Sequence, residues 1–177
     1  LAGAATGYRI VLGSLGYSQT TGIEQYQIDI TGTNDTTTGD LLIYQNGTRY
    51  NGAGGLRDAF YANWSAVTTP IVWINDPQAI QLVNGVSVQG LERLVLSTGS
   101  GNDAISNPHA NSGDDDIRTG PGADTVNGGP GDDLIDTSGD NDQITLSFGK
   151  DTIAGGAGTD RLVGDIDLRE STQFAKL

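Results

Sequence analysis

An aspartate recurs every nine residues in the second half of this chain, and each one stands two places before a large aliphatic residue. The unit occurs seven times between residues 98 and 163, with a three-residue insertion, Asn107-Pro108-His109, after the first copy. The recurring aspartates are Asp103, Asp115, Asp124, Asp133, Asp142, Asp151 and Asp160. The aliphatics are Ile105, Ile117, Val126, Ile135, Ile144, Ile153 and Leu162. Because carboxylates are hard oxygen ligands, this register suggests the binding of a hard divalent cation.

Glycine-rich turns must position these aspartates. Each unit divides into a six-residue turn that ends at the aspartate and a three-residue strand whose central aliphatic points inward. Glycines allow positive φ and let main-chain carbonyls crowd round an ion. The turn glycines are Gly99, Gly101, Gly113, Gly120, Gly122, Gly129, Gly131, Gly139, Gly149, Gly156 and Gly158.

Two units make one coil of about 18 residues, so aspartates two units apart stack roughly 4.8 Å from each other. At that separation two carboxylates repel by about 3.5 kcal/mol at an effective dielectric constant near 20. Calcium, with its flexible shell of about six to eight oxygens, relieves this repulsion. Magnesium needs a tighter octahedron, and zinc prefers nitrogen and sulfur ligands that the segment lacks.

The repeat resembles the calcium-binding nonapeptide of the repeats-in-toxin (RTX) family, G-G-x-G-x-D-x-U-x. Units 128–136 and 155–163 match it in full, whereas unit 137–145 has Asp140 in place of a glycine and unit 146–154 begins with Leu146 and Ser147. The resemblance covers residues 98–164 and implies a right-handed parallel β-roll loaded with calcium. It further implies that two stacked aspartates and main-chain carbonyls hold each of about four or five ions. Carried over, the pairs are Asp115 with Asp133, Asp133 with Asp151, Asp124 with Asp142, Asp142 with Asp160, and Asp103 with Asp124.

Two other interpretations of this segment are weaker. The composition alone would permit a disordered acidic linker, but seven aliphatics in phase with seven aspartates argue against disorder. An EF-hand loop starting at Asp114 lacks the glutamate that belongs at its twelfth place.

Residues for catalysis are scarce. His109 is the only histidine, and its place in a polar insertion favours a solvated loop residue over a general base. The chain has no cysteine, no G-x-S-x-G elbow and no H-E-x-x-H motif. A glycosidase-like carboxylate pair stays open, although the regular carboxylates are explained as calcium ligands. We therefore expect no enzyme, no catalytic residues and no cofactor other than calcium.

Residues 1–97 are expected to form a β-rich flanking segment with degenerate roll turns, and residues 165–177 a tail or the start of another module. Strands are predicted over 8–12, 24–30, 41–44, 60–64, 70–74 and 92–96. Aligning residues 52–57 with residues 156–161 puts Leu56 at the aspartate place. Six aromatics gather here: Tyr44, Tyr50, Phe60, Tyr61, Trp64 and Trp73. They favour a packed core or cap, and a glycan-binding platform at Trp64 or Trp73 is the alternative.

The formal net charge of −13, of which residues 98–165 carry −10, argues against nucleic acid and anionic membranes as partners. No apolar run is long enough for membrane insertion. Without cysteine, an exported chain needs a cross-link other than disulfides, and calcium would supply it. We therefore predict an extracellular or cell-surface structural calcium module, part of a large bacterial protein exported by type I secretion. The alternative is a glycan- or surface-binding module of an adhesin or carbohydrate-modifying enzyme.

Overall fold

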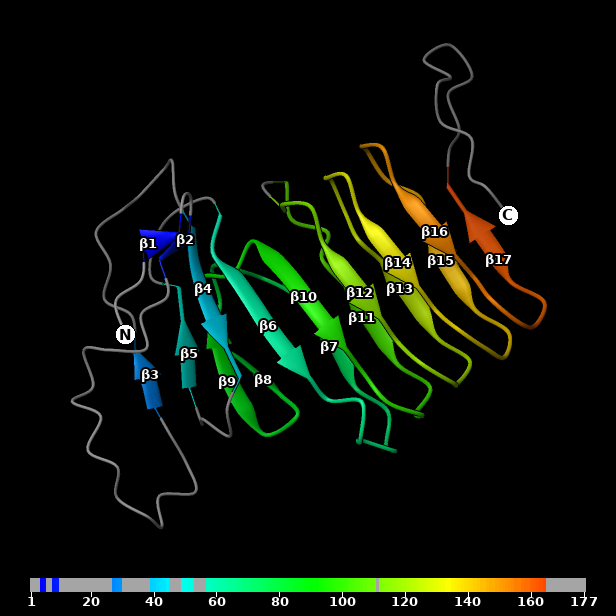
Figure 1. Ribbon diagram of the computed structural model, residues 1–177, viewed down its shortest axis with the longest axis horizontal. Helices are drawn as coiled ribbons and strands as arrows, with labels where there is room; N and C mark the ends of the chain where they lie inside the picture. Colours follow the sequence, from blue (N-terminus) through cyan, green and yellow to red (C-terminus); the bar gives the residue numbers. More distant parts are fainter. Residues whose placement is uncertain are drawn as a thin grey trace.

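A computed structural model describes residues 4–5, 8–9, 27–29, 39–44, 49–52, 57–110 and 112–164. These residues form strands and turns, and no helix long and apolar enough to cross a membrane occurs among them. The chain winds into an elongated stack of coils, with its first strands at one end and its last strands at the other (Figure 1). This is the all-β parallel roll that the repeat predicts.

One long sheet runs the length of the roll. Its strands, in spatial order, are β1 (Ala4–Ala5), β2 (Tyr8–Arg9), β4 (Gly39–Ile43), β6 (Ala59–Asn63), β10 (Arg93–Ser97), β12 (Asp116–Arg118), β14 (Leu134–Asp136) and β16 (Thr152–Ala154). Neighbouring strands are parallel, except that β1 and β2 are antiparallel. Parallel neighbours need a crossover connection, and from β6 onward a strand of the second sheet lies in that crossover.

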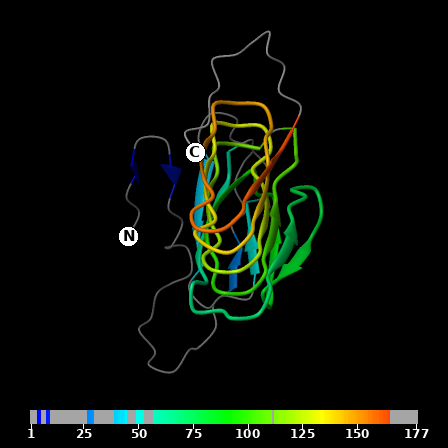
Figure 2. The same cartoon turned by 90° about the vertical axis from the view of Figure 1, so that its right-hand side faces the viewer.

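The second sheet contains β7 (Val72–Ile74), β11 (Ala104–Ser106), β13 (Thr125–Asn127), β15 (Gln143–Thr145) and β17 (Arg161–Val163), all parallel. From β10 to β17 the chain alternates between the two sheets, so each coil has one strand in each. Seen along the roll, successive coils superimpose as narrow closed loops (Figure 2).

The aliphatics of the repeat form the core between the two sheets. Six of them, Ile105, Ile117, Val126, Ile135, Ile144 and Ile153, are buried as predicted. They stack in register, Ile117 on Ile135 in one sheet and Val126 on Ile144 in the other. Leu162 is 36 % exposed because it lies in the last coil that the structure describes.

Aromatic rings fill the amino-terminal end of the same core. Tyr50, Phe60, Trp64 and Trp73 are at most 3 % exposed, and Tyr44 packs against them. Ring centroids of neighbouring pairs lie between 5.1 Å, for Tyr50 and Phe60, and 6.5 Å, for Trp64 and Trp73. The core is therefore wide and aromatic at this end and purely aliphatic along the repeats.

The prediction that Trp64 or Trp73 binds glycans is wrong. Both indoles lie inside the core, and the Trp73 Nε1–H donates to Gln81 Oε1 at 3.1 Å. An aromatic ring must expose a face to stack on a sugar, and neither indole does. Five of the six aromatics pack in the core as predicted, whereas Tyr61 is 42 % exposed.

A third sheet joins β3 (Gln27–Asp29), β5 (Arg49–Asn51), β9 (Val86–Gln89) and β8 (Gln81–Val83). The hairpin of β8 and β9 turns at Asn84 and Gly85, whose φ values are 44° and 77°. Asn-Gly between two apolar residues is a strong signal for a tight β-turn, yet this hairpin and β5 were not predicted.

The six strands predicted in the first half are present with shifted bounds: β4, β6, β7 and β10 overlap 41–44, 60–64, 70–74 and 92–96, and β2 and β3 fall within 8–12 and 24–30. The first sheet continues from β10 to β12 across the proposed boundary at residues 97 and 98. That boundary stays a prediction based on charge, and residues 165–177 lie outside the described residues.

Candidate metal centre

The recurring aspartates stand in two columns, because turns leading into the two sheets alternate along the chain. The Asp115 column comprises Asp115, Asp133 and Asp151, each directly before a strand of the first sheet. The Asp103 column comprises Asp103, Asp124, Asp142 and Asp160, each directly before a strand of the second sheet. Asp103 stacks on Asp124 even though the insertion lengthens the coil between them.

One carboxylate oxygen of each aspartate ties its coil to the preceding coil. Its Oδ1 accepts a hydrogen bond from a main-chain N–H in that coil. In the Asp103 column the donors are Ile71, Asp103, Asp124 and Asp142, at 2.7, 2.7, 2.9 and 3.1 Å. In the Asp115 column they are Leu94, Asp115 and Asp133, at 2.8, 2.9 and 3.2 Å. These bonds set the aspartates of a column in one register.

The other carboxylate oxygen, Oδ2, does not tie coils together in most of the turns. Among the described residues, the buried Oδ2 atoms of Asp103, Asp124, Asp133 and Asp142 accept no hydrogen bond. Burying a carboxylate oxygen without a partner is strongly unfavourable. Four equivalent oxygens in this condition fit a site for a cation much better than four independent packing defects.

Main-chain carbonyls of one coil come close to the turns of the next coil because those turns contain glycine. At Gly149 and Gly156, where φ is 136° and 82°, an added Cβ would overlap the carbonyl oxygens of Gly131 and Ser138 in the preceding coil. At Gly128, an added Cβ would overlap Asp133 Oδ2. The oxygens that these turns could offer to a cation are therefore carboxylate and carbonyl oxygens, which suit Ca²⁺.

The irregular unit 137–145 has positive φ at two residues that are not glycines. Ser138, with φ of 65°, lies close to the second-place glycines, whose φ values are 76° to 82°, whereas Asp140, at 79°, differs from the fourth-place glycines, at 136° to 147°. Gly139 has no positive φ, and the nearest atom to a Cβ added there is Ala157 O, at 3.8 Å. The stacking of coils on both sides imposes this conformation, since Pro121, Gly139 and Ala157 form bridges across three coils.

Without metal, three of the stacked aspartates bind a proton more tightly than an ordinary carboxyl group does. Burial raises the pKa of Asp115 to about 8, and the Asp133 carboxylate adds to the effect. Burial likewise raises the pKa of Asp133 to about 7 and that of Asp124 to about 6, again with neighbouring aspartates contributing. A cation would reverse these shifts by stabilising the ionised forms.

No three side chains of the types His, Cys, Asp or Glu cluster as a metal site within the described residues. The columns differ from such a cluster because stacked turns bring carboxylates together in pairs. The rest of a coordination shell would have to come from carbonyls and water, which calcium accepts and a His/Cys zinc site does not use.

A second ladder at the fifth place of the units was not expected from the sequence. Asn102, Asp114, Asp132 and Asn141 accept, through Oδ1, the main-chain N–H of the fifth-place residue in the following coil, at 2.8 to 3.1 Å. Asn or Asp directly before the recurring aspartate is the signal that could have found it.

Leu56, which the sequence places at an aspartate position, lies outside the described residues. Asp58 directly precedes β6, which begins at Ala59. The Asp58 main-chain N–H donates to Glu92 Oε2 at 2.9 Å. A carboxylate therefore ties these earlier coils together much as the aspartates do in the repeats.

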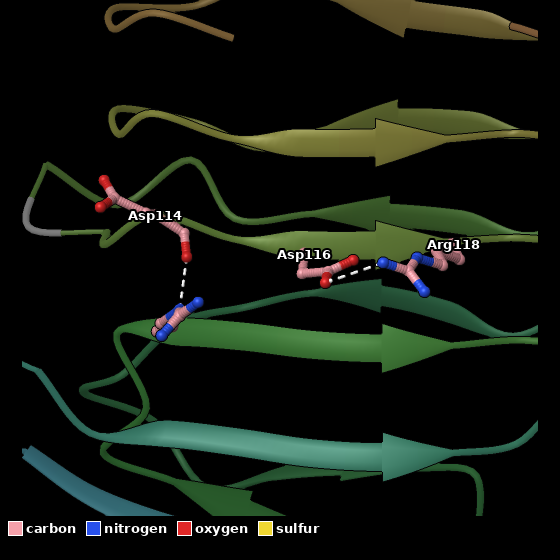
Figure 3. A network of polar contacts seen from close by, with 4 residues as sticks. Asp114, Asp116 and Arg118 are labelled. Carbon is pink, nitrogen blue, oxygen red and sulfur yellow. Dashed lines mark hydrogen bonds and ion pairs between the residues drawn. The ribbon is translucent and has the colours of Figure 1, made fainter. Parts of the chain in front are cut away.

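Charged side chains on the outer face of β12 pair with each other. Asp116 Oδ2 and Arg118 Nη2 are 3.1 Å apart (Figure 3). His109 lies in the turn before β12, where its carbonyl accepts the Ser112 N–H at 2.9 Å.

Comparison with known proteins identifies the repeat. The family model described as "RTX calcium-binding nonapeptide repeat (4 copies)" matches residues 109–144 and 137–167. Searches of curated proteins and of solved structures find no match. The matched residues include every member of the two columns except Asp103. Residues 109–167 are therefore RTX calcium-binding nonapeptide repeats.

Proposed function

We propose that this chain is a calcium-folded structural module of a larger exported protein. The supporting observation is the set of four buried Oδ2 atoms that accept no hydrogen bond, on aspartates whose Oδ1 atoms already tie the coils together. Bound Ca²⁺ would supply the positive charge that these oxygens lack.

Each ion would be held by two aspartates of one column and by carbonyls of their turns. The pairs are those that stack: Asp115 with Asp133, Asp133 with Asp151, Asp103 with Asp124, Asp124 with Asp142, and Asp142 with Asp160. We propose about four or five ions per chain.

The charge of the repeats supports a role outside the cell. Residues 98–165 carry a net charge of −10 on a glycine-rich backbone, so folding them without cations is unfavourable. They would stay extended where calcium is scarce, which suits export, and fold where calcium is plentiful. The role is structural, with no catalytic step assigned to it.

Isothermal titration of the calcium-free chain with Ca²⁺ tests this function. We expect about four or five ions per chain and a simultaneous gain of β-structure by far-UV circular dichroism. Mg²⁺ at the same concentration is the control, and it should produce neither change. One ion or none at millimolar calcium would contradict the proposal.

A further inference from the structure

Asp115 differs from the other buried aspartates of the two columns. Its Oδ2 accepts a hydrogen bond from Asn107 Nδ2 at 2.8 Å, whereas the same oxygen of Asp103, Asp124, Asp133 and Asp142 accepts none. All five side chains are at most 2 % exposed. The difference therefore comes from the neighbouring residue and not from exposure.

The register explains why Asn107 reaches this oxygen. Ser106 pairs with Asn127, so Asn107 takes the place that Gly128 has in the next coil. A Cβ at Gly128 would overlap Asp133 Oδ2. In the turn before Asp115, that space beside Oδ2 is filled by an amide group.

Asn107 belongs to a buried pair of amides, which we call the amide clasp: the side chains of Asn75 and Asn107. Asn75 Nδ2 donates to Leu91 O at 2.7 Å and to Asn107 Oδ1 at 2.9 Å. Asn107 Nδ2 donates to Glu92 O at 3.0 Å and to Asp115 Oδ2. Only an NH₂ group can lie between a carbonyl and a carboxylate in this way, so the orientation of the Asn107 amide is fixed by its partners.

The acceptors held by the amide clasp are the kinds of ligand that calcium takes. They comprise two main-chain carbonyls and one carboxylate oxygen, from two successive coils. A neighbouring carbonyl, Asp114 O, accepts a hydrogen bond from Arg93 Nε; Asp114 is labelled in Figure 3. At this coil a protein donor thus satisfies the Oδ2 oxygen that accepts no hydrogen bond in Asp103, Asp124, Asp133 and Asp142.

We propose that the amide clasp takes the place of a calcium ion at the amino-terminal end of the Asp115 column. The coil that ends at β12 then closes without metal and presents a formed turn on which the next, calcium-dependent coil stacks. This inference rests on the proposed calcium function, and it separates a metal-free part of the roll from the calcium-dependent part.

Two substitutions at Asn107 have different consequences. In Asn107→Ala the donors are lost and nothing replaces them. In Asn107→Asp one carboxylate oxygen keeps the Asn75 Nδ2 donor, but the other faces Glu92 O and Asp115 Oδ2, which are both acceptors, so a cation is needed there. Asn63→Asp is the matched control, because it adds the same charge at an exposed side chain whose Oδ1 accepts the Ser65 N–H at 3.1 Å.

Hydrogen exchange of the Leu94 main-chain N–H, which donates to Asp115 Oδ1, reports on the clasp. In chelator, both Asn107 variants should exchange this proton roughly tenfold faster or more than the wild type and Asn63→Asp. Calcium should restore protection in Asn107→Asp, with one additional ion by calorimetry, and should not restore it in Asn107→Ala.

Suppose that the wild type binds about four or five ions. The amide clasp inference is then overturned, while the proposed function stands, if both Asn107 variants exchange the Leu94 N–H as slowly as the wild type does. The same holds if Asn107→Asp gains no additional ion and calcium does not restore its protection. If the wild type binds no calcium, the proposed function fails. Loss of protection throughout the roll in Asn107→Ala, even in calcium, would also count against a local role for the clasp.

Discussion

At the scale of single residues, the two oxygens of each recurring aspartate have separate roles. Oδ1 has a structural role, since it accepts a hydrogen bond from the main-chain N–H of a residue in the preceding coil. Oδ2 is the oxygen that most turns leave without a donor. One side chain thus sets the register of the roll and offers a ligand, which explains why no other residue occupies the sixth place.

Removing Asp133 should affect two neighbouring ions. It stacks between Asp115 and Asp151, so Asp133→Ala should lower the calcium bound at saturation by up to two ions, and weaken the affinity at least roughly tenfold. Asp116→Ala is the control, because that carboxylate pairs with Arg118 on the outer face. Equal losses in the two variants, measured by calorimetry, would contradict the assignment of ligands.

Asp140 is a place where the sequence departs from the repeat at a cost in conformational energy. Its φ of 79° is unfavourable for a residue with a side chain. Asp140→Gly should therefore raise the free energy of unfolding in calcium by about 1 kcal/mol. Asp140→Ala removes the same charge but keeps a Cβ, so it should stabilise less or destabilise. Thermal denaturation of both variants checks the difference, and equal shifts would point to charge as the cause.

At the scale of strands and turns, the sequence predicted the repeats well because the nine-residue period of the aliphatics and that of the aspartates mark the same strands and turns. Each aliphatic marks a strand and each aspartate marks the end of a turn, so the stacking of Asp103 on Asp124 followed even across an insertion. The first half lacks such agreement. Asp58 and Glu92 tie coils together with carboxylates at irregular spacing, and this contact depends on strands that are far apart in sequence.

The role of Asn107 could not be predicted for a related reason. Its partners are Asn75, the Glu92 carbonyl and Asp115, and they come together only once three turns have stacked. From the sequence, Asn107 is simply part of a polar insertion.

Because three aspartates of the two columns have raised pKa values, the stability of the metal-free protein should depend on pH. The folded-state pKa values of Asp124, Asp133 and Asp115 are about 6, 7 and 8, all raised above the ordinary value of 3.8. A raised folded-state pKa means that the folded form binds more protons, so this contribution to stability is lost as pH rises through about 6 to 8. In chelator, the repeats should therefore be close to unfolded at pH 8.5 and gain β-structure at pH 5 by far-UV circular dichroism, with unfolding at a higher temperature at pH 5 than at pH 8.5.

Calcium should reverse this trend, because the ion requires ionised carboxylates and protons compete with it. In saturating calcium, the protein should be more stable at pH 8 than at pH 5. A metal-free protein whose melting temperature falls steadily from pH 8 to pH 5 would show that burial does not set these pKa values.

At the scale of the whole molecule, the two ends of the roll are stabilised by different forces. The β6 and β10 coils bury aromatic rings, together with three residues of the five-residue strand β6 and two of β10, Leu94 and Leu96. The later coils bury one aliphatic for each nine residues and carry most of the negative charge. We therefore expect hydrophobic burial to support the first end without metal, and the second end to need cations for folding.

Hydrogen exchange along the chain, with and without chelator, should show this division. In chelator, the main-chain N–H groups of β6 and β10 should remain protected, whereas those of β13 to β16 should exchange close to the rate of an unfolded chain, because glycine-rich turns lose much entropy on ordering. The transition should fall near β12, just after the turn that the amide clasp closes. Adding calcium should protect β13 to β16, since binding energy then becomes folding energy. Equal protection of β13 to β16 in both conditions would mean that the roll is held by packing and β-ladders alone, and that calcium occupies a structure already formed.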